Sequence, residues 1–76
     1  MLYIVEGNDY IPLTYYQDVE IIEQVSGNLT LSFTTFNHGE NAYDKVVEEK
    51  TIFVGEHEFV IKQIEENGIV KKVSAV

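Results

Sequence analysis

Short runs of β-branched and aromatic residues, each closed by turn-forming residues, occupy most of this chain. Strands favour β-branched and aromatic residues, and tight turns favour Gly, Asn and Asp. The clearest turn is Asn67-Gly68, which separates two alternating apolar runs and predicts a β-hairpin with these two residues as its loop. In that register Ile64 faces Lys71, and Phe59 faces Val76. The pattern restricts the chain to a largely antiparallel β fold.

A second hairpin is predicted over residues 19–25 and 29–36, with Gly27-Asn28 as its loop. This loop places Ile22 opposite Phe33 and Val19 opposite Phe36. Both faces of the hairpin then carry apolar side chains, whereas a small two-layer domain usually keeps one face polar. One face holds Ile22, Leu29, Leu31 and Phe33; the other holds Val19, Ile21, Val25 and Phe36. The second apolar face therefore predicts a partner that covers it.

The remaining segments complete a mostly β (α+β) domain. Residues 2–5, 51–54, 57–64 and 69–76 are predicted strands. Residues 10–16 contain Pro12, which lacks a backbone N–H, so they form a loop or an edge segment. In the C-terminal hairpin, Phe59 and Ile61 are expected on the face opposite Ile64 and Val73.

One short helix is expected near residues 41–48. Asn41 can cap its first turn, and the helix docks on the sheet through Tyr43, Val46 and Val47. It should end near Glu48, because acidic residues oppose the dipole at a helix C-terminus. The expected architecture is about six strands in a bent sheet or a small, partly open barrel, with this helix at one end or edge.

Size and charge exclude several functions. A chain of 76 residues makes one domain, 1–76, with a small core and no cysteine that could form a stabilising disulfide bond. Five lysines, no arginine and a net charge of −8 exclude nucleic-acid binding, which depends on cationic contacts with phosphates. No stretch approaches the roughly 20 apolar residues of a membrane-spanning helix, and no secretory signal precedes the first strand.

No motif predicts catalysis, a metal or a cofactor. A zinc-protease pattern on His57-Glu58 requires a second histidine four residues after the first, and that position is Ile61. The adjacent pairs Glu48-Glu49 and Glu65-Glu66 diverge on a helix end or a strand, as solvated surface residues do. The chain is therefore not expected to be an enzyme by itself.

Several ordered motifs resemble one known family. They are the strand at residues 27–34 (GNLTLSFT), the short acidic-ended helix at 41–49, and the strand at 58–64 (EFVIKQI). Together, over residues 15–76, they resemble the N-terminal domain of the phage tail endopeptidase family, the tail-associated lysins of siphoviruses and Gram-positive prophages. Phe59 stands where that family usually has tyrosine.

The resemblance implies a structural role at the virion tail tip, after synthesis in the bacterial cytoplasm. Members of this family form a trimeric baseplate hub below the distal tail protein, and their peptidoglycan-degrading module lies downstream. No catalytic residue can be carried over to this chain. The chain stops within its last apolar strand, so we expect it to be the N-terminal fragment of a larger tail hub protein.

Two functions from different classes remain open. In the first, the domain self-associates in a ring through an assembly interface formed by apolar residues, namely Val19, Ile21, Phe36, Tyr15 and Tyr16. In the second, it is a small acidic β-domain that binds a peptide or a sugar through Tyr10, Tyr15 and Tyr16. The two functions differ in whether these side chains meet another copy of the chain or a ligand.

Overall fold

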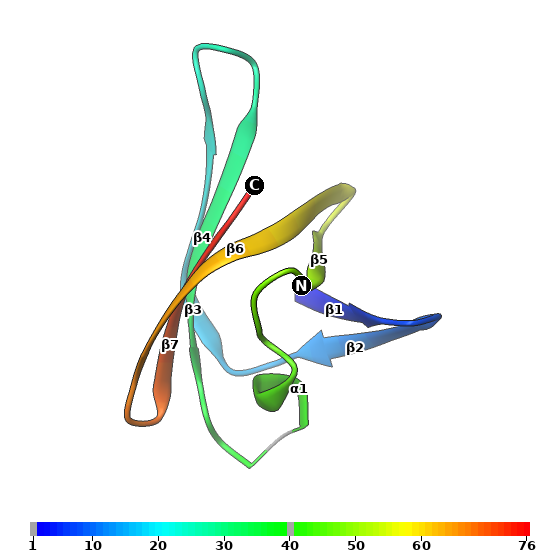
Figure 1. The fold of residues 1–76 in the computed structure, drawn as a ribbon, viewed down its shortest axis with the longest axis vertical. Helices are drawn as coiled ribbons and strands as arrows, with labels where there is room; N and C mark the ends of the chain where they lie inside the picture. Colours follow the sequence, from blue (N-terminus) through cyan, green and yellow to red (C-terminus); the bar gives the residue numbers. More distant parts are fainter. Residues whose placement is uncertain (1, 40) are drawn as a thin grey trace.

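A single curled antiparallel sheet dominates the computed structural model, which describes residues 2–39 and 41–76 (Figure 1). Within these residues the sheet has seven strands in the order β2-β1-β5-β6-β7-β4-β3. The elements are β1 (Leu2–Glu6), β2 (Asp9–Leu13), β3 (Tyr16–Glu23), β4 (Leu29–Phe36), α1 (Asn41–Asp44), β5 (Thr51–Val54), β6 (His57–Asn67) and β7 (Val70–Ala75). The mostly β prediction is confirmed, with one strand more than the expected number of about six.

The long strand β6 belongs to both halves of the sheet. Its beginning pairs with β5, from His57 opposite Val54 to Val60 opposite Thr51. Its remainder pairs with β7, and the register shifts by one residue at Lys62. Such a bulge bends a strand and increases its twist. The half-sheet β2-β1-β5-β6 therefore turns away from the half-sheet β6-β7-β4-β3, and α1 lies on the concave side between them (Figure 1).

The hydrophobic core fills the concave side. Phe33 and Leu31, which the sequence placed on the core face of their strand, are 2% and 1% exposed. The core cluster draws on both half-sheets and on the α1 segment: Leu2, Ile4, Leu13, Leu31, Phe33, Ala42, Val46, Ile52, Phe59, Ile61, Val73 and Ala75. Side chains from distant parts of the sequence thus share one small core.

The helix is shorter than expected. It ends at Asp44 and not near Glu48, and Val47 is 41% exposed, so the prediction that Val47 docks on the sheet is wrong. The physical reason lies in the next backbone segment. The N–H of Glu49 donates to the Ile61 carbonyl at 2.7 Å, and the N–H of Ile61 donates to the Lys50 carbonyl at 2.9 Å. These bonds to β6 pull the chain out of the helical path.

The predicted register of the β3–β4 hairpin is wrong. Ile22 lies opposite Thr30, not Phe33, because the chain turns over a wider loop, in which the N–H of Gln24 donates to the Asn28 carbonyl. Ile22 therefore points away from the core. A bulge between Gln17 and Glu20 shifts the register once more and also removes the predicted pairing of Val19 with Phe36.

The predicted register of the C-terminal hairpin, β6–β7, is also wrong. Ile64 lies opposite Val73, not Lys71, and the loop is formed by residues 68–69. The bulge at Lys62 inserts an extra residue, so Phe59 and Ile61 lie on the same side as Ile64 and Val73. Their predicted separation onto two faces is wrong for this reason.

Both edges of the sheet come from strands that follow each other in the chain. Residues 10–16 were predicted to be a loop or an edge segment, and β2, which contains Pro12, is indeed an edge strand. The other edge is β3. Among the described residues, no helix is long and apolar enough to span a membrane.

Candidate functional site

The residues predicted to form an assembly interface do not share one face. Val19, Ile21 and Tyr15 are 41%, 39% and 42% exposed. Tyr16 packs against the core on the concave side, whereas Phe36 is half-buried and points to the convex side, as its alternation with buried Thr35 requires. The structure therefore distributes these five side chains over the two faces and the edge of one half-sheet.

The three tyrosines considered for ligand binding are also separated. The Tyr10 ring stacks on Phe53, with ring centroids 5.4 Å apart, on the first half-sheet. The Tyr15 ring stacks on His38 at 4.2 Å, and Tyr16 packs against the core. They do not form one aromatic strip.

A mostly apolar face, with Thr51 and Glu58 as polar members, lies on the convex side of the half-sheet β2-β1-β5-β6. Cross-strand pairing places Tyr3 beside Pro12 and Phe53, and Val5 beside Tyr10. These residues alternate along their strands with buried core residues, so their side chains point outward. We call this surface the outer apolar face; its residues are Tyr3, Val5, Tyr10, Pro12, Phe53 and Val60.

The sequence contains a signal for the outer apolar face that the predicted interface did not include. Residues 2–5, 10–13 and 51–54 are apolar at almost every position, and they do not alternate between apolar and polar residues. Such uninterrupted runs are typical of strands covered on both faces. Tyr10 is nevertheless 58% exposed here.

The β3–β4 hairpin projects beyond the rest of the domain (Figure 1). Its exposed side chains include Ile22, at 46%, and Val25, which is fully exposed near the turn. Strand β3 pairs with β4 on one side only, because it ends the sheet. We call its free side the β3 edge. This edge is a second surface at which the domain is incomplete.

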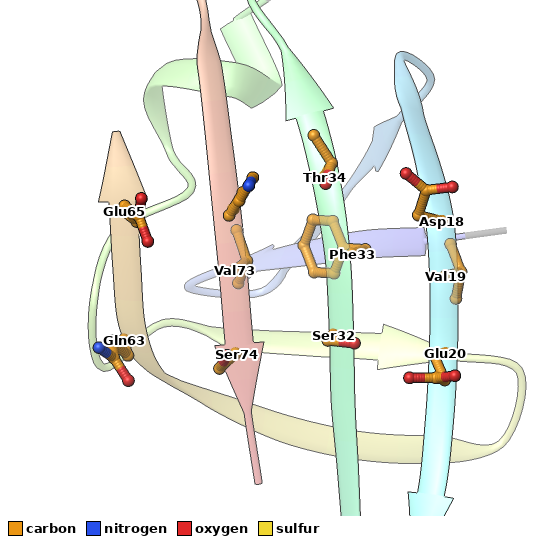
Figure 2. A pocket seen from close by; sticks show the side chains of 11 residues that line it. Asp18, Val19, Glu20, Ser32, Phe33, Thr34, Gln63, Glu65, Val73 and Ser74 are labelled. Carbon is orange, nitrogen blue, oxygen red and sulfur yellow. The ribbon is translucent and has the colours of Figure 1, made fainter. Parts of the chain in front are cut away.

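A shallow groove of about 660 Å³ runs along β3 on the convex side of the second half-sheet (Figure 2). Asp18 and Glu20 line one side of it, and Glu65 lines the other. The rest of the lining consists of Lys72, the polar residues Ser32, Thr34, Gln63 and Ser74, and the apolar residues Val19, Phe33 and Val73. The groove therefore carries three carboxylates against one ammonium group.

A buried lysine fixes the α1 segment. Lys71 is 6% exposed, and its Nζ donates to the carbonyls of Tyr43 and Val46, both at 2.9 Å. The same ammonium lies 4.4 Å from the centroid of the Tyr43 ring. The Tyr43 hydroxyl donates to Glu66 Oε2 at 3.4 Å. Burial raises the pKa of the Tyr43 phenol, and the nearby Glu66 carboxylate raises it further.

Most other lysines bind carboxylates within the domain. Glu6 Oε2 lies 2.8 Å from Lys50 Nζ and 3.7 Å from Lys45 Nζ, which links the β1–β2 hairpin to the segment after α1. The hydrogen bond from Lys50, together with the charges of both lysines, lowers the pKa of Glu6 below its usual 4.5. Lys62 pairs with Glu49 at 3.3 Å.

No group of three or more metal-ligating side chains occurs in residues 2–39 and 41–76. The His57 ring lies 6.3 Å from the Phe59 ring in a tilted arrangement, and the His38 ring is stacked on Tyr15. Both histidines therefore have aromatic neighbours. The described surface offers faces and edges for contact with other proteins.

Comparison with known proteins gives one match. A family model described as the prophage endopeptidase tail N-terminal domain matches residues 2–76. No curated protein and no solved structure matches the chain.

Proposed function

Because the chain belongs to the family of prophage endopeptidase tail N-terminal domains, we propose that it is a structural assembly module of the tail tip, without catalytic activity of its own. The outer apolar face is the observation that carries the proposal. Six apolar side chains on a four-stranded half-sheet form the kind of surface that marks a protein–protein interface. Tyrosine and phenylalanine are also enriched in the centres of such interfaces.

Copies of the domain pack side by side in a ring through this face, as part of a baseplate hub below the distal tail protein. The resemblance noted above supports a trimer, and the family description supports an N-terminal position in a larger tail protein. In this proposal the protein is made in the bacterial cytoplasm and assembles into the virion tail, and any peptidoglycan hydrolase lies in another domain. It requires no cofactor, nucleic acid or membrane.

The position in the virion can be tested with an epitope tag. The turn at Gly55-Glu56 between β5 and β6 is exposed and lies outside the outer apolar face, so a tag inserted there leaves that face free. Immunogold electron microscopy of particles from an induced lysogen should show label at the tail tip. Label on the capsid, along the tail shaft or on no particle would contradict the proposal.

The role of the outer apolar face is tested in the same tagged protein. Tyr10→Glu places a charge on this face beside Phe53 and should remove the label from the tail tip, because the charge would be buried without a partner in the interface. Ile69→Glu is the matched control, since Ile69 is 63% exposed in the β6–β7 turn, away from this face. It should leave the label in place. Equal behaviour of the two variants, with both folded by circular dichroism, would exclude the outer apolar face as the interface.

A further inference from the structure

We propose that the β3 edge binds an extended, basic segment of a different tail protein, which adds to the sheet as an eighth strand. This inference rests on the proposed function, because it takes the partner to be another component of the tail. It concerns a surface separate from the outer apolar face, and it commits to a partner of defined chemistry: a peptide segment that carries lysine or arginine.

The backbone of β3 is prepared for an added strand. Beyond its bulge, from Glu20 opposite Ser32 to Glu23 opposite Leu29, β3 pairs regularly with β4. No described strand lies on its other side. A row of unpaired N–H and C=O groups on an edge strand is a template for another strand. The opposite edge of the sheet contains Pro12, which cannot donate to such a ladder.

Two exposed aliphatic side chains on β3 would be shielded from solvent by an added strand. Ile21 lies opposite Leu31 on the concave side, and Ile22 lies opposite Thr30 on the convex side. They are 39% and 46% exposed, because β3 has no neighbour at the edge of the projecting hairpin. Cross-strand neighbours on an added strand would shield both residues.

The charges on β3 determine what kind of strand fits. Asp18 and Glu20 line the groove in Figure 2, and Glu65 faces them across it. Glu23 lies opposite Leu29, on the concave side of the same strand. The ion pairs within residues 2–39 and 41–76 involve only Glu6 and Glu49 among the carboxylates. The carboxylates of β3 therefore have no lysine of this domain in an ion pair. A strand with lysine or arginine side chains would complement them.

A second copy of the chain cannot supply those cations. All five lysines lie in the described part of the chain: Lys45 and Lys50 bind Glu6, Lys62 binds Glu49, and Lys71 is buried. Only Lys72 is left. Pairing two copies through β3 would also bring like charges together, which destabilises cross-strand pairs. The partner is therefore a different polypeptide.

Site-specific photo-crosslinking in assembled tails tests this inference. A benzophenone amino acid at position 22 should crosslink to a lysine- or arginine-containing segment of another tail protein, identified by mass spectrometry of the crosslinked peptide. The same group at position 69 is the control and should not capture that segment. A crosslink from position 22 to a copy of this protein, or none above the control, would overturn the inference.

A pair of charge variants gives the second measurement. Glu20→Gln with Glu23→Gln should lower the crosslink yield from position 22 by about 3- to 10-fold, which corresponds to about 0.7–1.4 kcal/mol for the loss of two exposed ion pairs together. Glu48→Gln with Glu56→Gln removes the same charge from other exposed sites and should leave the yield unchanged. Equal yields from the two double variants would refute the charge match.

The two proposals can fail separately. If the tag at the β5–β6 turn is absent from the tail tip, the proposed function fails. If the tag is at the tip but position 22 captures no basic segment of another protein, only the β3 edge inference fails.

Discussion

At the scale of single residues, the ammonium group of Lys71 joins two parts of the domain that share few other bonds. Its two carbonyl acceptors, in Tyr43 and Val46, lie 28 and 25 residues earlier in the chain. The Tyr43 carbonyl also accepts from the Val46 N–H at 3.2 Å, whereas the Val46 carbonyl lies beyond the end of α1, where acceptors lack helical partners. Because the site is buried, neither the ammonium nor the carbonyls can exchange these bonds for water. Lys71 therefore adds two buried hydrogen bonds to the core contacts of Ala42 and Val46 that hold the α1 segment on the sheet.

Replacing this side chain tests that dependence. Lys71→Met should lower the free energy of unfolding by about 1–3 kcal/mol, because it keeps the volume but leaves the Val46 carbonyl without the ammonium donor and the Tyr43 carbonyl with only the Val46 N–H. Lys72→Met is the control on the adjacent position, whose side chain lies in the convex groove, and it should cost less than about 0.5 kcal/mol. Urea unfolding followed by circular dichroism measures both. Equal losses would mean that the bonds to α1 contribute nothing.

The role of Lys71 could not be predicted from the sequence. Lysine is among the residues least often buried, so its position in the last strand indicated only a solvated side chain. Lys71 is buried because the α1 segment supplies two carbonyl acceptors for its ammonium group. No local sequence pattern connects that segment to residue 71. By contrast, Phe33 and Leu31 were placed correctly, because their alternation with Ser32 and Thr34 is a local signal.

At the scale of elements, the strands were predictable and their registers were not. Runs of apolar residues and turn-forming residues located six of the seven strands, and Pro12 correctly marked the residues of β2 as an edge segment. The registers failed because both hairpin loops differ from the predicted ones, at residues 24–28 and 68–69, and because two bulges, beside Asp18 and at Lys62, shift the pairing again. Neither bulge contains glycine, although Asp18 has a positive φ of 58°. Nothing in the local sequence therefore marks them. The outer apolar face was missed because its residues lie on two hairpins that are far apart in the sequence, β1–β2 and β5–β6.

The face assignment of β4 leads to a prediction at this scale. Phe33→Ala should destabilise the domain by about 3–5 kcal/mol, because Phe33 is 2% exposed in the centre of the core. A loss of this size approaches the whole stability of a small domain, so the variant should be unfolded at room temperature. Thr34→Ala, on the opposite face, should remain folded. Thermal unfolding of the two variants checks this, and similar melting curves would show that the faces are reversed.

At the scale of the whole molecule, the net charge of −8 opposes association between copies. Ring formation through the outer apolar face must overcome this repulsion, which added salt screens beyond about 10 Å at 0.1 M. Self-association of the chain should therefore strengthen as salt rises, and sedimentation velocity at low and high salt measures it. An assembly that dissociates as salt rises would contradict this expectation. The β3 edge has the opposite dependence, because contacts between carboxylates and a basic strand weaken with salt.

The shared strand β6 has a consequence for the order in which the domain can form. The hairpins β1–β2 and β3–β4 are complete early during synthesis, but they belong to different half-sheets. In the described part of the chain, the strands that connect them through hydrogen bonds are β5, β6 and β7, which all follow both hairpins in the sequence. Pairings between distant segments form slowly, because the intervening chain must first be ordered. The apolar surfaces of both early hairpins therefore stay uncovered until the last strands of the domain have been made.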